Sequence, residues 1–169
     1  TKDRLDPEAK ENIDTMIRNT DRLATLINQL LDFRKAERQG FKLHPVECDV
    51  REVIENICIR FVIMARQKHI ALTFDLPEET QYAAVDREAL TKIVSNLLSN
   101  ALKYAQTYAR LEMTITEEQE VLRIAVTNDG TVVPEPMREQ IFLPFMQYRD
   151  GKHLIAGTGI GLTLARALA

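Results

Sequence analysis

Glycine and proline are distributed very unevenly along the 169-residue chain, and this contrast constrains its fold more than any other feature. Residues 1–39 contain one proline, Pro7, and no glycine, whereas residues 130–161 contain five glycines and three prolines. Both residue types interrupt regular elements and mark turns and loops. The front of the chain is therefore predicted to form one long helix, and the back is predicted to form loops around a site.

The predicted front helix begins at Asp6-Pro7, a capping residue followed by proline at the first helical position, and ends at Gly40. Its apolar residues repeat as in a helical bundle: Ile13, Met16, Ile17, Leu23, Ala24, Ile27, Leu30 and Leu31. One helix cannot bury such a stripe alone. We expect a neighbouring helix outside this sequence and a homodimer through this helix, with packing on its own domain as the alternative.

The remaining residues predict an α+β domain. Asp49 and Asp86 each precede a run with helical apolar spacing, and a further apolar run follows Gly161. Alternating apolar residues at 70–75, 111–115 and 122–126 indicate strands, and residues 82–85 are predicted to form a further short strand. This order favours an α/β sandwich with a mixed, largely antiparallel sheet and a helical layer, preceded by one long bundle helix.

Composition excludes several classes of protein. The chain is 45% apolar and 28% charged, with no apolar run of membrane-spanning length. The net charge of −3 lacks the basic excess of a nucleic-acid-binding domain. Cys48 and Cys58 do not have metal-ligand spacing. We therefore expect a cytoplasmic protein with reduced cysteines, and we expect these 169 residues to contact neither nucleic acid nor a membrane.

Three polar residues share one face of the predicted helix that follows Asp86. Asn96, Asn100 and Lys103 fall within about 60° of one another, opposite the leucine face. Carboxamide oxygens suit Mg²⁺, and an ammonium group suits phosphate. The pattern is compatible with a metal-phosphate site, and the alternative is an ordinary solvated face.

A second motif reads Gly157-Thr158-Gly159-Ile160-Gly161-Leu162 and opens a helix. Glycines permit close approach of a ligand, and the free N–H groups of a helix start bind anions. The motif suggests a phosphate cradle, with a flexible hinge as the alternative. It differs from the dinucleotide fingerprint because its spacing is wrong and no strand precedes it.

Two further segments carry candidate residues. Asn128-Asp129-Gly130 ends a predicted strand, where a side-chain oxygen could accept a hydrogen bond from a base amino group, or simply form an Asx turn. Phe142-Leu143-Pro144-Phe145 indicates either core packing or the anchor of a mobile lid.

In their order, these motifs closely resemble the asparagine box (96–104), first glycine box (128–130), phenylalanine box (142–145) and second glycine box (157–162) of bacterial sensor histidine kinases. Residues 21–33 look like the second helix of that family's dimerisation and phosphoacceptor hairpin. The resemblance covers nearly the whole chain, and the sequences of both parts are similar to those of large hybrid two-component sensors. It implies a hairpin helix over 1–40 and an ATP-binding catalytic domain over 41–169, truncated at its C-terminal end.

The resemblance implies a Bergerat-type ATP site with Mg²⁺, with Asn100 as the metal ligand and Asn96 beside it. A lid over about 148–156 would close on the phosphates. The family transfers the γ-phosphoryl group of ATP to a histidine and then to an aspartate of a response-regulator receiver domain. The chain would be the cytoplasmic portion of a membrane-anchored sensor. The implied nucleotide contacts are Asn96, Asn100, Lys103, Tyr104, Asn128, Asp129, Gly130, Phe145, Gly157, Thr158, Gly159, Ile160, Gly161 and Leu162.

The sequence departs from this family pattern at several positions. Asn128 stands where the family has an acidic adenine acceptor, and Val132 stands at a glycine position, so Asp129 is an alternative acceptor. His44, His69 and His153 do not fit the phosphoacceptor motif. A degenerate, non-catalytic signalling module of the same fold is therefore the main alternative. Another ATPase of this fold, such as an anti-sigma-factor kinase, fits less well because of the front helix.

Overall fold

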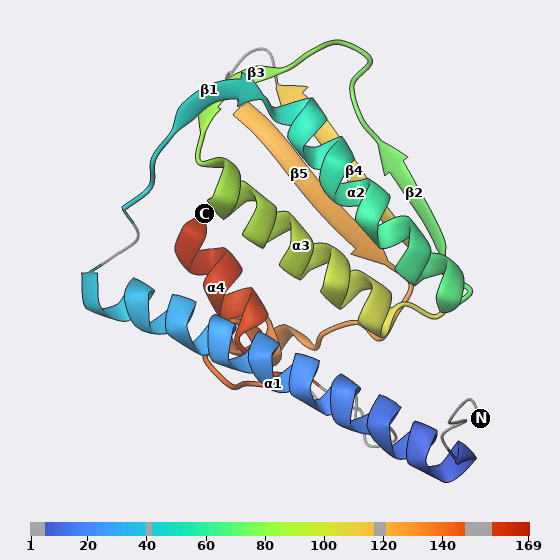
Figure 1. The fold of residues 1–169 in the computed structure, drawn as a ribbon. Helices are drawn as coiled ribbons and strands as arrows, with labels where there is room; N and C mark the ends of the chain where they lie inside the picture. Colours follow the sequence, from blue (N-terminus) through green and yellow to red (C-terminus); the bar gives the residue numbers. More distant parts are fainter. Residues whose placement is uncertain (1–5, 40–41, 117–120, 148–156) are drawn as a thin grey trace, which may run out of the picture.

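The computed structural model describes residues 6–39, 42–116, 121–147 and 157–169 (Figure 1). The predicted long front helix is present as α1 (Pro7–Gln39), and it lies along one side of the predicted α+β domain. The domain continues through β1 (Val46–Asp49), α2 (Val50–Gln67), β2 (Ala71–Asp75), β3 (Tyr82–Val85), α3 (Arg87–Tyr104), β4 (Tyr108–Thr116), β5 (Val121–Asn128) and α4 (Gly161–Leu168). None of the helices in these ranges is long and apolar enough to span a membrane.

The predicted caps start the two central helices. Asp49 accepts a hydrogen bond from the backbone N–H of Arg51 at 3.0 Å, at the start of α2. Asp86 accepts from the N–H groups of Glu88 and Ala89, both at 3.0 Å, at the start of α3. Each aspartate satisfies donors that have no partner within the helix, so the caps fix where both helices begin.

The strands form two sheets. In the larger sheet, β4 lies between β2 and β5 and pairs parallel with β2 and antiparallel with β5. β1 pairs antiparallel with β3 in a separate two-stranded ladder. The mixed, largely antiparallel prediction is confirmed. Two short 3₁₀ helices, η1 (Glu135–Met137) and η2 (Gln140–Phe142), which the sequence pattern did not predict, lie in the segment after β5.

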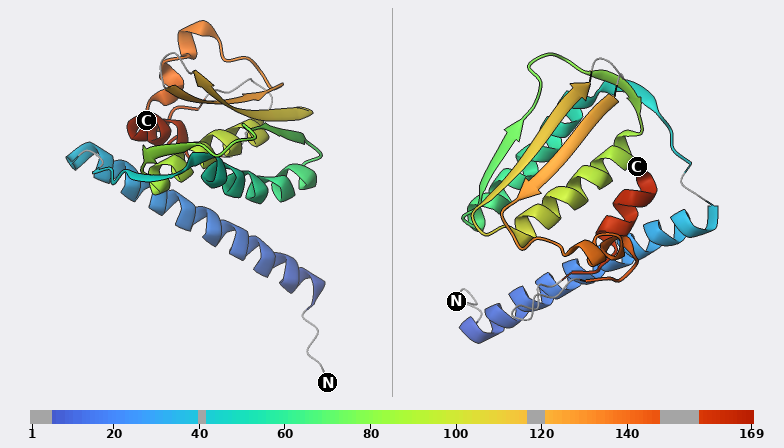
Figure 2. Two further views of the ribbon diagram at one scale, coloured as in Figure 1. Left: turned by 90° about the horizontal axis from the view of Figure 1, so that it is seen from above. Right: turned by 180° about the vertical axis from the view of Figure 1, so that it is seen from behind.

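α2 and α3 cover one face of the larger sheet (Figure 2). Their buried faces and the inward side chains of β4 form the main core, which includes the fully buried Ile54, Leu98 and Leu111. α4 packs on α3 through a smaller cluster of Ala89, Leu164 and Leu168. Burial of these apolar side chains is the main force that holds α3 in place, and it leaves the opposite face of α3 for polar residues.

Most of the apolar stripe of α1 is exposed. Met16 is 68% exposed and Leu23 is 57% exposed, although α1 contacts α4. The helix therefore lies against its own domain without burying the apolar residues that the sequence places in a bundle. A stripe of this kind normally packs against other helices.

Candidate functional site

The polar row of α3 faces the glycine-rich segment that leads into α4. Asn96, Asn100 and Lys103 are all half-buried, and the helix is held by its capped start and its buried leucines. The Nζ atom of Lys68 donates to the carbonyl oxygen of Leu102 at 3.0 Å, which caps the other end of α3. Both ends of the helix that carries the row are thus fixed.

Two of the three glycines in the second glycine motif touch this row. A Cβ atom added to Gly161 would lie 3.1 Å from Oδ1 of Asn96, and one added to Gly157 would collide with Nζ of Lys103. The backbone at both positions therefore lies directly against side chains of α3, and a larger residue would require the Asn96 or Lys103 side chain to shift. The structure brings together two motifs that are separated by more than fifty residues of sequence.

The middle glycine of this motif meets the phenylalanine motif. Gly159 has a φ of +70°, and the N–H of Phe145 donates to its carbonyl oxygen at 2.9 Å. A Cβ atom at Gly159 would lie 2.6 Å from the carbonyl carbon of Phe145. Phe145 itself has a φ of +63°, and the residue is 61% exposed. The backbone, rather than the ring, joins the two motifs, and Phe145 does not serve as a core residue.

Gln147 adds a side-chain contact to the same junction. Its Nε2 atom donates to the carbonyl oxygen of Gly157 at 2.7 Å. The expected lid over 148–156, together with His153, lies outside the described residues. The hydrogen bond between Gln147 and Gly157 therefore connects the two described residues that flank this segment.

Asn128 forms the Asx turn considered from the sequence. Its Oδ1 atom accepts a hydrogen bond from the N–H of Gly130 at 2.8 Å. A Cβ atom at Gly130 would collide with the carbonyl oxygen of Tyr104, at the end of α3. The turn after β5 therefore sits directly against the C-terminal end of the helix that carries the polar row.

The carboxylate of Asp129 holds the start of β4. It accepts hydrogen bonds from the N–H groups of Gln106, Thr107 and Tyr108, and from the hydroxyl of Thr107. The hydrogen bond from the Thr107 side chain, together with those from the backbone, lowers the pKa of Asp129 to about 2. Asp129 is therefore a structural carboxylate, and the sequence contains no local signal for this role.

Lys103 supplies the positive charge at the site. Its Nζ atom lies 4.7 Å from the centroid of the Tyr104 ring, within range of a cation–π contact. Among the residues that the structure describes, no carboxylate forms an ion pair with Lys103. The ammonium group is thus available to an anion.

Two contacts that sequence reasoning missed connect α1 to this region. The hydroxyl of Thr158 donates to Oε1 of Gln29 at 2.7 Å. Nζ of Lys92 lies 3.1 Å from a carboxylate oxygen of Asp32 and 2.9 Å from one of Glu88. Partial burial disfavours the charged form of Lys92, but its hydrogen bonds to the two carboxylates outweigh this and raise its pKa.

The described residues hold no cluster of three or more histidine, cysteine or acidic side chains that could bind a metal ion. Among the described residues, the candidate metal ligands at this site are therefore the amide oxygens of Asn96 and Asn100 on α3. Cys58 cannot contribute, because burial raises the pKa of its thiol to about 12.

Comparison with known families identifies the domain that carries these motifs. The family model described as histidine kinase-, DNA gyrase B- and HSP90-like ATPase matches residues 85–169. This range includes α3, the turn after β5 and both ends of the junction.

Curated relatives are sensor and hybrid kinases. The chain is 34% identical to the hybrid signal transduction protein dokA of Dictyostelium discoideum, over 94% of the chain and 10% of that protein. It is 27% identical to sensor histidine kinase WalK of Bacillus subtilis, over 88% of the chain and 25% of WalK. The chain thus spans at most about a quarter of these two relatives.

Solved structures share the fold. ShkA in complex with AMPPNP matches with a TM-score of 0.78 at 22% identity, over 98% of this chain and 34% of that one. The catalytic domain of histidine kinase ThkA matches with a TM-score of 0.62 at 25% identity, over 75% of this chain and 80% of that one. A further ThkA structure, with a TM-score of 0.67 at 24% identity over 86% of this chain and 43% of that one, is a complex with the response regulator protein TrrA.

Proposed function

Because the chain belongs to the family of histidine kinase-, DNA gyrase B- and HSP90-like ATPases, we propose that it binds ATP with Mg²⁺ in order to deliver the γ-phosphoryl group to a histidine outside this sequence. One observation carries the proposal: Asn96 and Lys103 of α3 lie against the glycines at 161 and 157. A helix start, a glycine-lined backbone and one ammonium group together suit a polyphosphate.

The donor set of α3 fits Mg²⁺. Asn96 and Asn100 are one helical turn apart and half-buried, and they offer neutral amide oxygens to a hard cation. The phosphates of ATP would complete the coordination with water, as Mg²⁺ sites usually require. When bound, the ion would neutralise charge on the transferring phosphoryl group.

The adenine acceptor is assigned to Asn128 rather than Asp129. Within the described residues, the hydrogen bonds that the Asp129 carboxylate accepts all come from residues 106–108 at the start of β4, so its lone pairs are largely used there. Oδ1 of Asn128 has one donor, the N–H of Gly130, and carbonyl-type oxygens have two lone pairs. A neutral amide can therefore still accept from a base amino group, although more weakly than a carboxylate.

The remaining assignments rest on the similarity to sensor and hybrid histidine kinases. Residues 1–40 would form the second helix of a dimerisation hairpin, and 41–169 would form the catalytic domain. The exposed apolar stripe of α1 supports a homodimer through this helix. The receiver domain of a response regulator is the proposed final phosphoryl acceptor, and the ThkA–TrrA complex shows that one relative binds such a protein. The full protein would be a membrane-anchored sensor with this part in the cytoplasm.

Displacement of a fluorescent ATP analogue tests the nucleotide site. ATP with Mg²⁺ should displace the analogue, and Lys103→Ala should weaken binding at least tenfold because it removes the cation beside the phosphates. Lys42→Ala is the control, since Lys42 is exposed and lies outside the site. Equal affinities for both variants would contradict the assignment, and absence of binding in the folded chain would favour a degenerate signalling module.

A further inference from the structure

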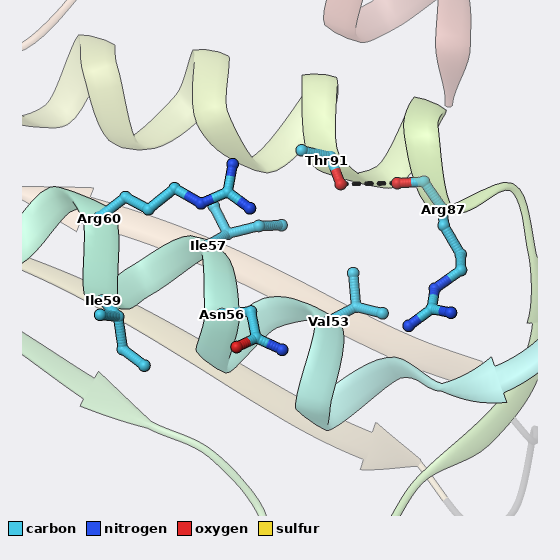
Figure 3. Close-up of a pocket in the computed structure, with 7 residues that line it drawn as sticks. All are labelled: Val53, Asn56, Ile57, Ile59, Arg60, Arg87 and Thr91. Carbon is cyan, nitrogen blue, oxygen red and sulfur yellow. Dashed lines mark hydrogen bonds between the residues drawn. The ribbon is translucent and has the colours of Figure 1, made fainter.

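A groove between α2 and α3 lies outside the site described above. It encloses about 420 Å³ and is lined by Val53, Asn56, Ile57, Ile59, Arg60, Arg87 and Thr91 (Figure 3). Val53 and Ile57 are buried and form an apolar floor. Among the described residues, no acidic side chain lines the groove.

Two arginines stand at opposite ends of this groove. Figure 3 shows Arg87 of α3 at one end and Arg60 of α2 at the other, with Val53 and Ile57 between them. Arg60 follows Val53 by two helical turns, which correspond to roughly 10 Å along the axis. Neither guanidinium forms an ion pair within the part of the chain that the structure describes, whereas those of Arg51, Arg110 and Arg166 do.

The groove is independent of the nucleotide site. Asn96 follows Arg87 by nine residues, which at 100° per residue places the two side chains on opposite sides of α3. An occupant of the groove would therefore touch the α2 side of the helix and leave the polar row accessible. Binding at one place can be measured without blocking the other.

From this geometry we propose that the groove binds an acidic polypeptide segment of a partner protein. Two carboxylates of the segment sit on Arg60 and Arg87, and an apolar side chain between them rests on Val53 and Ile57. Arginine forms bidentate hydrogen bonds with carboxylates, which gives both attraction and orientation. A single small anion cannot satisfy guanidiniums at both ends of an apolar floor, so the spacing favours an extended segment with separated charges.

Fluorescence anisotropy with a labelled Asp-Glu-Leu-Glu-Asp peptide tests the proposal. We expect binding at low ionic strength that weakens as salt rises. The double variant Arg60→Glu/Arg87→Glu should lose at least tenfold in affinity. Arg123→Glu is the matched control, because Arg123 is exposed on β5 and should leave binding unchanged. Replacing the leucine of the peptide with serine should also weaken binding, since the apolar floor loses its partner.

Several results would overturn the proposal. These are no binding of the acidic peptide, equal binding by the charge-reversed variant, or equally strong binding of a Lys-Lys-Leu-Lys-Lys peptide. Competition by inorganic phosphate at concentrations similar to the peptide would show a simple anion site instead. Circular dichroism and ATP-analogue displacement on the same variants verify folding, and they separate a failure here from a failure of the proposed nucleotide function.

Discussion

The hydroxyl of Thr158 donates a hydrogen bond to the side-chain oxygen of Gln29 at 2.7 Å, across 129 positions of sequence. Thr158 lies between two glycines that touch α3 and the phenylalanine motif, while Gln29 lies on the long helix. The N–H of Ile160 also donates to the Thr158 hydroxyl, at 3.2 Å. This one side chain thus ties α1 to the backbone of the proposed phosphate loop.

A double-mutant cycle measures the strength of this connection. Gln29→Ala and Thr158→Val should each reduce the free energy of unfolding, and their effects should couple by about 1 kcal/mol, the usual net value of such a hydrogen bond. Urea denaturation of the wild type, both single variants and the double variant provides the four free energies. Strictly additive effects would show that the contact contributes nothing to holding α1 on the domain.

Alanine substitutions at Gly159 and at Gly161 in the second glycine motif should destabilise the protein to different degrees. Gly159→Ala should reduce the free energy of unfolding by at least about 2 kcal/mol, because a positive φ is strained for alanine and the new Cβ would press on the backbone of Phe145. Gly161→Ala should reduce the free energy of unfolding by less, because Gly161 is helical and a Cβ atom there would meet only the Asn96 side chain, at 3.1 Å. Thermal denaturation compares the two. Equal losses would contradict the assigned backbone conformation.

The Asp129 carboxylate should make stability depend on pH in the acid range. Its pKa is lowered from 3.8 to about 2 by the hydrogen bonds at the start of β4. A lowered pKa means that the stabilisation is complete above the unfolded value of about 4 and is lost as pH falls through about 2. The melting temperatures of wild type and Asp129→Asn should therefore differ at pH 7 and converge toward pH 2.

The control for this titration is Asp14→Asn, since Asp14 is an exposed residue of α1. Its melting temperature should follow that of the wild type throughout. A constant difference between Asp129→Asn and wild type from pH 7 to pH 2 would show that the carboxylate charge is irrelevant to the turn.

The first glycine motif should bind adenine more tightly when it carries a charge. Asn128→Asp replaces a neutral acceptor with a carboxylate that keeps the hydrogen bond from the Gly130 N–H. Charge-assisted hydrogen bonds are about twice as strong as neutral ones, so the dissociation constant for an ATP analogue should fall roughly three- to tenfold. Unchanged or weaker affinity would indicate that Asn128 does not contact the base.

The helices and strands could be predicted because their signals are local. Asp49 and Asp86 precede apolar runs of helical period and cap α2 and α3. Leu72 and Phe74 of β2 point inward while their neighbours are exposed, as strict alternation requires. The observed β4 and β5 are longer than the alternating segments. Their ends carry polar side chains, which interrupt the apolar alternation, but the pairing between the two strands continues there.

The long-range contacts could not be predicted. The parallel pairing of β2 with β4 depends on how α3 packs on the sheet, and one sequence does not specify that arrangement. The sequence offered Asp129 as a ligand acceptor, whereas the structure uses its carboxylate at the start of β4, a role that needs a partner segment 21 to 23 residues away. The Gln29–Thr158 contact leaves no periodic signal at all.

The central claim is that α3 and the second glycine motif form one Mg-ATP site. Calorimetric titration of the chain with AMPPNP, with and without Mg²⁺, tests it most directly, using wild type and Asn100→Ala. Mg²⁺-dependent binding by wild type that falls at least tenfold in a folded Asn100→Ala variant is the predicted result. Binding that neither Mg²⁺ nor the substitution changes, or no binding by the folded wild type, would contradict the account.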